Sequence, residues 1–162
     1  MTLEVEKPLD ETGWRLLVEL QQNARLSYTE LGQRVGLSLP SVAERIRKME
    51  EAGIIIGYHA EVDLSRLGLP ILSLIRLGNF VGESCGRVAE QASDVPEVME
   101  CYKVTGDDCV VIKVVAASMP HLEQVIEQLS RFSIASTAIV FSRPLKSRFV
   151  TRDLLERAET GP

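Results

Sequence analysis

Two short predicted helices, separated by a tight glycine-containing turn, constrain the fold of this chain more than any other feature. Ser27 and Glu30 have the spacing of a capping box, in which the two side chains satisfy free amides at a helix start. Gly36 suits the left-handed residue that ends such a helix. Only two residues later, Ser38 is positioned to cap another helix, whose first turn tolerates Pro40. This spacing predicts a helix-turn-helix.

A preceding helix completes the expected N-terminal domain. Asp10 is positioned to cap this helix, which should run to about Asn23. The apolar residues expected to form the shared core recur at helical spacings, and they are Leu16, Leu17, Leu20, Leu31, Val35, Val42, Ile46 and Met49. The third helix should end at Gly53, and residues 54–62 then look like a short strand or hairpin. Residues 1–62 are therefore expected to form a winged-type helix-turn-helix domain.

The outer side of the third helix is the candidate DNA-binding surface. On a helical wheel its polar groups lie away from the apolar stripe, and the candidate contacts are Ser38, Pro40, Ser41, Glu44, Arg45, Arg47 and Lys48. Guanidinium groups can read guanine edges, and hydroxyls at a helix N-terminus can reach phosphates. Arg45 lies nearest the buried edge, so it has the alternative of a structural ion pair with Glu30 or another acid.

The second half of the chain alternates between strand and helix patterns after a turn-rich linker over residues 63–69. We expect strands over 71–80, 98–105, 110–117 and 137–141. Between them lie two helix faces, one formed by Cys85, Val88, Ala89 and Ala92 and the other by Leu122, Val125, Ile126 and Leu129. The order βαββαβ is the ferredoxin-like arrangement, with both helices on one face of a four-stranded sheet. The fold class is thus α+β, with this domain over residues 70–146.

The open face of that sheet predicts a homodimer. The first strand is apolar on both sides, with Ile71, Ile75 and Leu77 on one side and Leu72 and Leu74 on the other. A second layer must cover the side away from the helices, and another copy of the same domain is the economical candidate. The remaining tail, residues 147–162, is rich in charge, and a short helix is expected around positions 154–155.

Composition narrows the class of protein. The net charge of −5 argues against a generic nucleic-acid coat, so DNA binding requires positive charge concentrated on one element. No apolar run approaches the ~20 residues of a membrane-spanning helix, and the N-terminus lacks a signal pattern, so we expect a cytoplasmic protein without membrane contact.

The cysteine and histidine spacings give no indication of a metal site. Cys85, Cys101 and Cys109 form no CxxC pair, and the two histidines lie far apart. The expectation is therefore reduced thiols, no metal and no cofactor. Cys109 is interpreted as a small buried side chain, with a redox-sensing thiol as the alternative. In a two-residue hairpin it would lie opposite Val104 and face away from Cys101, which argues against an internal disulfide.

Several interleaved motifs over residues 9–146 resemble the Lrp/AsnC, or feast/famine, regulators. The N-terminal matches are Leu9-Asp10, Asn23-Ala24-Arg25, Glu30-Leu31, Val35-Gly36-Leu37-Ser38, Arg45 and Glu51-Ala52-Gly53-Ile54-Ile55. The C-terminal matches are Pro96-Glu97-Val98, Cys101-Tyr102 and Val104-Thr105-Gly106-Asp107. The resemblance implies a sequence-specific, non-enzymatic transcription regulator that binds double-stranded promoter DNA. It also implies homodimers that assemble into tetramers or octamers and an amino acid or related effector bound between dimers.

The resemblance places the effector pocket at the glycine-containing loop after the second sensor strand. The matching positions are Tyr102, Val104, Thr105, Gly106, Asp107, Asp108 and Cys109, with Thr137 a neighbour on the last strand. The family loop usually ends in an acid suited to an ammonium group, and this chain has Cys109 there. Either Asp108 takes over, or the ligand is not a typical α-amino acid, or there is none. A plain β-turn at positions 106–107 is the structural alternative.

Two other functions compete with the regulator. A branch resembling this family decarboxylates sirohaem with basic and histidine-bearing strands, whereas the matching strand here has one lysine, Lys103, and no histidine. An architectural DNA-binding protein would rely on extensive phosphate neutralisation, which the acidic net charge disfavours.

Overall fold

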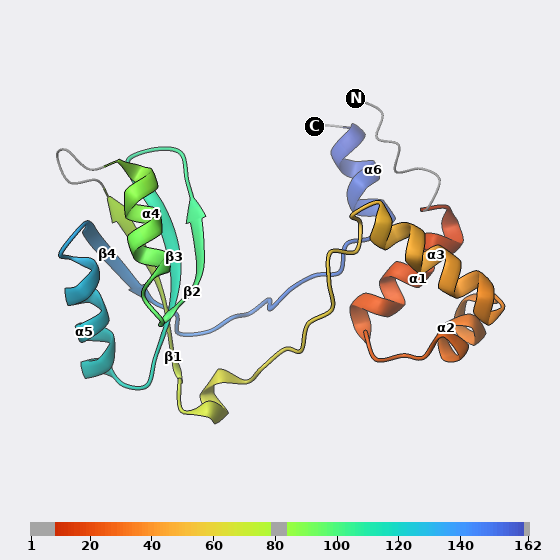
Figure 1. The fold of residues 1–162 in the computed structure, drawn as a ribbon, viewed down its shortest axis with the longest axis horizontal. Coiled ribbons are helices and arrows are strands. Elements are labelled where there is room, and N and C mark those ends of the chain that lie inside the picture. The colour runs from red at the N-terminus through yellow and green to blue at the C-terminus, as the bar shows by residue number, and fades with distance from the viewer. Residues whose placement is uncertain (1–8, 79–83, 161–162) are drawn as a thin grey trace. The chain divides into compact units, whose positions relative to one another are not determined.

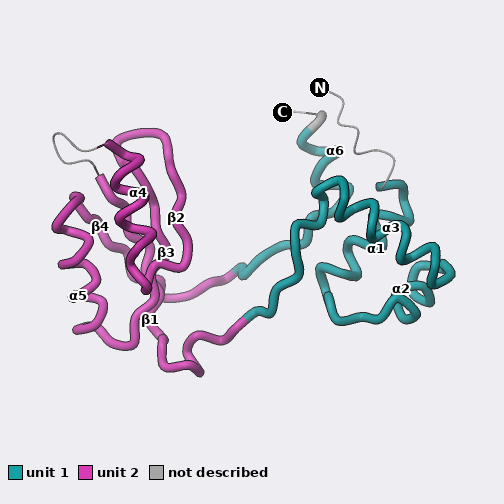
Figure 2. Tube along the Cα trace, viewed as in Figure 1, with its two compact units in different colours: residues 1–61, 145–162 teal, residues 62–144 magenta. Residues whose placement is uncertain are grey.

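The computed structural model describes residues 9–78 and 84–160 (Figure 1). The chain divides into two compact units (Figure 2). Unit 1 combines the residues up to 61 with the C-terminal segment from 145, and unit 2 comprises residues 62–144. The helical and sheet-forming halves predicted from the sequence therefore correspond to separate compact bodies, and each is described by itself below.

Three helices form the N-terminal part of unit 1: α1 over Glu11–Gln22, α2 over Tyr28–Val35 and α3 over Leu39–Glu51. The predicted caps are confirmed. The Asp10 carboxylate accepts a hydrogen bond from the Gly13 amide at 2.8 Å, and Ser27 and Glu30 form both halves of the capping box. Gly36 ends α2 with φ +75°, a conformation that glycine adopts without strain. Local side-chain chemistry thus defines where these helices start and stop.

The apolar stripes of these helices share one core. Leu16, Leu31, Val42, Ile46 and Met49 are fully buried in it, and Leu20 and Val35 are nearly so. The predicted core is confirmed. Its effect is to fix α3 by its inner face and leave the opposite face of that helix exposed.

The strand or hairpin expected over residues 54–62 is wrong. This stretch lies within the described part of the chain and forms no strand there. The amides of Ile54 and Ile55 donate to the Met49 carbonyl, at 2.9 and 3.2 Å, so they complete the end of α3. Both side chains pack on the helical core, whereas Ile56 is 92% exposed. The first two amides of the expected hairpin are therefore used by the helix end.

The C-terminal segment packs with unit 1. The side-chain amide of Gln21 donates to the Val150 carbonyl at 3.0 Å and accepts from the Val150 amide at 2.8 Å. This pair of bonds satisfies the backbone of the incoming chain as a strand partner would. Helix α6 follows over Arg152–Thr160, which confirms the helix predicted around Leu154.

Unit 2 is the predicted βαββαβ domain. A short 3-10 helix over Leu64–Leu67 precedes β1 (Ile71–Gly78), α4 (Cys85–Ser93), β2 (Val98–Lys103), β3 (Asp108–Ala116), α5 (Met119–Leu129) and β4 (Ile134–Ile139). The strands form an antiparallel sheet in the order β2-β3-β1-β4. Side chains of both helices join one core with alternate residues of β1 and β3, so both helices cover the same face. The ferredoxin-like fold is confirmed.

The last strand is displaced from its predicted position. It was expected over 137–141, but it begins at Ile134, which pairs with Gly78, and ends at Ile139, which pairs with Ser73. Phe141, within the expected strand, is fully exposed. The length of β1 decides which residues of β4 can pair, and local propensity does not carry that information. The expected end of the first strand, at residues 79–80, lies outside the described residues.

The register between β1 and β3 slips by one residue at its end. Leu77 pairs with Val110, and Gly78 then pairs with Asp108, so Cys109 is skipped. An extra residue of this kind re-aims its side chain out of strict alternation. Cys109 consequently joins the helix-side core, where Cys101 also packs. The expectation that Cys109 faces away from Cys101 is therefore wrong, although Cys109 does lie opposite Val104.

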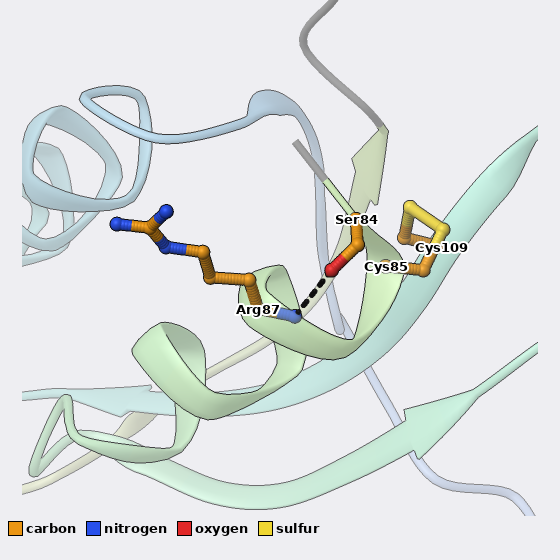
Figure 3. Close-up of a disulfide and its surroundings, with 4 residues drawn as sticks. All are labelled: Ser84, Cys85, Arg87 and Cys109. Carbon is orange, nitrogen blue, oxygen red and sulfur yellow. Dashed lines mark hydrogen bonds between the residues drawn. A yellow bond between two sulfur atoms is a disulfide. The ribbon is translucent and has the colours of Figure 1, made fainter. Parts of the chain in front are cut away.

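Cys85 and Cys109 form a disulfide (Figure 3). This overturns the expectation of reduced thiols for these two residues, while Cys101 remains a thiol. Cys85 begins α4 and Cys109 begins β3, and their Cα atoms lie 4.9 Å apart. They lie 24 positions apart in the sequence, so only the folded domain brings them together.

The longest described helix, α3, has 13 residues. Crossing a bilayer takes ~20 apolar residues. Within residues 9–78 and 84–160, no helix has the length and apolar character to span a membrane.

Candidate DNA-reading surface and effector loop

The first turn of α3 presents polar groups at its exposed end. The Ser38 hydroxyl accepts a hydrogen bond from the Ser41 amide, and the Oγ atoms of the two serines lie 2.9 Å apart. Pro40 occupies the first turn, and all three side chains are exposed. A helix N-terminus with its remaining free amides favours an anion, so this end of α3 suits a DNA phosphate.

The exposed cations of α3 are held by carboxylates of the same helix. The Arg47 guanidinium donates to both Glu44 oxygens, at 2.8 Å and 2.9 Å from Nη2, and it also pairs with Glu51. Lys48 lies 3.3 Å from Glu44. These hydrogen bonds from Arg47 and Lys48 lower the pKa of Glu44. Exposed pairs of this kind are weak, so a phosphate or base can displace the carboxylate at little cost.

Arg45 has a different partner. Its two terminal nitrogens donate to the two oxygens of Asp10, at 2.7 and 2.8 Å, which is a bidentate pair. The hydrogen bond from Arg45 is the main cause that lowers the pKa of Asp10. Asp10 is also the cap of α1, so the pair joins α3 to the start of the first helix. The structural alternative for Arg45 is thus present, with Asp10 as the acid in place of Glu30.

The loop between β2 and β3 contains the candidate effector residues. The Val104 amide donates to the Cys109 carbonyl at 3.3 Å, which closes the loop. Inside it, Gly106 has φ +111°, a backbone conformation that favours glycine. Thr105 and Asp107 are exposed within the same loop. The loop is therefore a closed four-residue connection whose polar groups face solvent.

Asp108 has a cationic neighbour that the sequence did not reveal. The Arg76 Nε atom lies 3.9 Å from an Asp108 carboxylate oxygen, and its Nη2 donates to the Ser136 hydroxyl at 3.3 Å. Arg76 comes from β1 and Ser136 from β4, so three strands contribute to this polar cluster. Only the sheet order places β1 beside both β3 and β4. Arg76 supplies a positive group that could hold the carboxylate of an effector, while Asp108 could hold its ammonium.

Tyr102 lies on the sheet face away from the helices and is 54% exposed. Its hydroxyl donates to Glu100, which also accepts from the Lys113 ammonium at 2.7 Å. Lys113 and then Tyr102 lower the pKa of Glu100, and Glu100 raises the pKa of Tyr102. The result is a fixed polar row across β2 and β3 beside the loop.

Two of the predicted effector residues are not brought to the loop surface. Thr137 lies on β4, whereas the loop leaves β2, and these strands are the opposite edges of the sheet. Thr137 instead lines a groove between α5 and β4. Cys109 is only 2% exposed, and its sulfur is bonded to Cys85. Within one chain, neither side chain therefore joins Asp108 at the loop surface.

The described parts of both units match known protein families. Residues 9–56 match the family described as "Winged helix-turn-helix DNA-binding", and residues 72–150 match the "Lrp/AsnC ligand binding domain". The HTH-type transcriptional regulator LrpC of Bacillus subtilis is 34% identical over 83% of this chain and 92% of its own length. The proline dehydrogenase transcriptional activator of Rhodobacter capsulatus is 38% identical, with 75% of this chain and 81% of that protein covered.

Solved structures agree with these sequence matches. The structure of B. subtilis LrpC superimposes with a TM-score of 0.79 at 32% identity, covering 86% of this chain and 99% of that one. A transcriptional regulator from Neisseria meningitidis in complex with L-methionine gives a TM-score of 0.82 at 25% identity, with 91% and 99% covered. With the helix-turn-helix, the ferredoxin-like sheet and relatives of nearly equal length, this chain belongs to the Lrp/AsnC family of DNA-binding transcription regulators.

Proposed function

We propose that this regulator binds double-stranded promoter DNA through the outer face of α3 and that an amino acid at the β2–β3 loop modulates binding or assembly. The proposal for DNA binding rests on the exposure and the ion pairs of Arg47 and Lys48. Both are exposed, and both are held by exposed carboxylates on their own helix. Such cations can exchange a carboxylate for a phosphate or a guanine edge.

The proposed DNA contacts divide by position along α3. Ser38, Pro40 and Ser41 lie at the exposed N-terminus and would face phosphates. Arg47 and Lys48 lie farther along, with Glu44 between them and the N-terminal turn. Arg45 is assigned a positioning role, because its bidentate pair with Asp10 leaves α3 anchored rather than free to reach DNA. Two copies would present their α3 helices to half-sites about 34 Å apart, or multiples of that.

Fluorescence anisotropy on the DNA upstream of the protein's own gene tests this surface, with scrambled DNA as the reference at fixed salt. Arg47→Ala and Lys48→Ala should each weaken binding on the order of tenfold and leave the oligomeric state unchanged. Arg66→Ala is the matched control, since Arg66 is also exposed and paired with an acid three residues away, but it lies in unit 2. Unchanged affinity in both α3 variants would contradict the assignment.

The effector half rests on the pair of charges at the loop. An α-amino acid carries one ammonium and one carboxylate, and Asp108 and Arg76 offer the opposite charges 3.9 Å apart. The relative from N. meningitidis was solved with L-methionine, which makes that amino acid the first ligand to try. Residues Tyr102, Val104, Thr105, Gly106 and Asp107 would line the same site, with Thr137 contributed from another copy.

Calorimetric titration with L-methionine and then a pool of amino acids tests the site. Asp108→Ala should abolish the heat of binding and any shift in DNA affinity, without unfolding the protein. Asp94→Ala is the control, because Asp94 is exposed at the end of α4 and has no part in the loop. A retained response in Asp108→Ala would move the pocket elsewhere. If neither L-methionine nor the pool gives a heat of binding to the wild type, the result would support the plain β-turn.

The assembly would be a homodimer built on the open sheet face, with tetramers or octamers formed from dimers. Leu74 is 44% exposed and Ile134 is 61% exposed, and the register places both on the face away from the helices. Burying such residues against a second copy would remove apolar surface from water. Leu74→Asp should shift sedimentation toward a smaller species, whereas Ile56→Asp in unit 1 should not. Equal sedimentation of both variants would place the interface elsewhere.

Comparing the affinities for upstream and scrambled DNA distinguishes a sequence-specific regulator from an architectural DNA-binding protein. Equal affinity for the two DNAs would favour it, and a clear preference for the upstream DNA would favour a sequence-specific regulator.

A further inference from the structure

We propose that Cys85 and Cys109 are a reversible redox site, oxidised by small-molecule disulfides, and that the disulfide fixes the β2–β3 loop. The site consists of two sulfurs from elements that are distant in sequence, the start of α4 and the start of β3. Nothing in the proposed DNA or effector binding uses either sulfur. The proposal therefore stands even if the loop binds no amino acid.

The two cysteines, drawn in Figure 3, differ in burial. Cys85 is exposed, whereas Cys109 is buried in the core between the sheet and its helices. Reagents in solution therefore meet Cys85 before they meet the buried Cys109. The buried sulfur of Cys109 is already within bonding reach, since the two Cα atoms lie 4.9 Å apart. This is the arrangement of an attacking thiol with a resolving thiol behind it.

The position of Cys85 favours its reactive form. It is the first residue of α4, a helix of nine residues whose cap, Ser84, accepts a hydrogen bond from the Arg87 amide at 3.3 Å. The N-terminal end of a helix carries partial positive charge, which favours a thiolate over a thiol. The Arg87 side chain points away from the two sulfurs, so this effect comes from the helix end (Figure 3). The nucleophile and its partner are thus differentiated by their surroundings.

Cys109 connects this chemistry to the loop. Its carbonyl oxygen accepts the Val104 amide that closes the loop, and Asp108 is its neighbour in the chain. The register skips Cys109 on β1, so its place depends on the core and on the bond to Cys85. Breaking that bond removes one of the anchors of the loop's C-terminal end.

The oxidation is a thiol–disulfide exchange. The Cys85 thiolate attacks one sulfur of an oxidised disulfide such as glutathione disulfide, which forms a mixed disulfide and releases one thiolate. The Cys109 thiolate then attacks the Cys85 sulfur, which forms the internal bond and releases the second thiolate. Two electrons pass from the cysteine pair to the oxidant, and the two thiol protons end on the two released thiols. Excess reduced thiol reverses both steps.

A protein that binds DNA works where glutathione keeps thiols reduced, and disulfides in that setting are usually transient and redox-sensing. A pair that cycles between thiols and a disulfide would make the state of the loop depend on the concentration of the oxidant.

The first test measures the pairing in the full-length wild-type protein. Aliquots are equilibrated in glutathione buffers from fully reduced to fully oxidised, and free thiols are alkylated and located by peptide mass spectrometry. We expect Cys85 and Cys109 to be protected together, without bound glutathione, and to be recovered together on returning to reducing buffer. Cys101→Ser should behave identically. Protection that appears separately at the two residues, or stable glutathione on Cys85, would overturn the proposal.

The second test measures the loop. Hydrogen–deuterium exchange of the reduced and oxidised wild type compares the amides of residues 104–109 in the same folded chain. We expect exchange there to be on the order of tenfold slower in the oxidised form, with α1–α3 unchanged. Equal exchange in the two forms would overturn the link between the disulfide and the loop. Neither readout involves DNA or an effector, so failure here is distinguishable from failure of the proposed function.

Discussion

The two units of this regulator secure their functional groups in different ways. In unit 1, the cations of α3 are held by carboxylates three or four residues away on the same helix. In unit 2, the loop is held by partners from other elements: Arg76 from β1 beside Asp108, and Cys85 from α4 bonded to Cys109.

The difference indicates what each surface is suited to do. Local exposed pairs open at little cost and leave the helix intact, which suits a rigid element that exchanges one anion for another. A loop held by interactions with several elements changes conformation only when one of those interactions changes. Such a loop suits a sensor, because a ligand or a redox reaction can alter these interactions.

Core truncations should separate the two units most strongly. Ile46→Ala in unit 1 removes a fully buried side chain and should cost about 2–5 kcal/mol, enough to lose DNA binding. Amide protection in the sheet of unit 2 should persist. Ile112→Ala, fully buried in unit 2, should do the reverse. Ile56→Ala, at an exposed site, is the control, with an expected change within about 0.5 kcal/mol. If one truncation removed amide protection in both units, the result would contradict the expectation that each unit is stabilised by its own core.

Reduction of the disulfide should be the next largest effect and should fall on unit 2 alone. Closing a loop of 24 residues in the unfolded chain is worth about 3 kcal/mol. Denaturant unfolding followed by exchange in each unit should show that loss in reducing buffer, with unit 1 unaffected. Cys101→Ser in oxidising buffer should retain the full stability. A loss spread equally over both units would contradict the comparison.

The Asp10–Arg45 pair should contribute less, and its contribution should depend on pH. Asp10→Ala removes both the cap and the ion pair and should cost about 2 kcal/mol, whereas Asp10→Asn keeps a capping side chain and should cost about 1 kcal/mol or less.

The direction of the pH effect follows from the Asp10 carboxyl, whose pKa in the folded protein is lowered from its ordinary 3.8. The contribution is therefore present above about pH 4 and is lost as the pH falls through the lowered value. Thermal unfolding between neutral pH and pH 3 should show a steeper decline for the wild type than for Asp10→Asn. Parallel curves would mean that the pair is not formed in solution.

The smallest expected effect tests whether the local pairs of α3 limit DNA affinity. Glu44→Gln leaves Arg47 and Lys48 without a charged partner at that position and should raise affinity for scrambled DNA on the order of threefold. Glu50→Gln is the matched control, because it changes the net charge equally. The Glu50 carboxylate accepts a hydrogen bond from the Tyr58 hydroxyl, at 2.9 Å, rather than holding Arg47 or Lys48. Equal gains in both variants would indicate a general charge effect.

Much of unit 1 could be predicted because its signals are short in sequence. Ser27 and Glu30 act within one turn of helix, and Gly36 acts on its own backbone. The prediction of a strand or hairpin over residues 54–62 failed for a related reason: the use of the Ile54 and Ile55 amides by the end of α3 was not visible in the sequence. Arg45 was recognised as able to pair with an acid, yet Asp10 lies 35 residues away and could not be selected by spacing.

The candidate sensor site was less predictable. The loop itself was located, and the structure gives Gly106 in that loop a φ of +111°. Arg76 and Cys85 were missed as partners of that loop. Arg76 alternates within an apolar strand and Cys85 fits an apolar helix face, so neither carries a local signal of its role.

The sequence by itself determined the helix boundaries, the two apolar cores and the βαββαβ order, because each depends on periodicity and capping within a few residues. Tertiary structure alone decided the register slip at Cys109, the disulfide to Cys85, the Arg76–Asp108 pair and the separation of Thr137 from the loop. These depend on which strands become neighbours and how far they pair. That outcome is set by the packing of the whole domain, and no short stretch of residues encodes it.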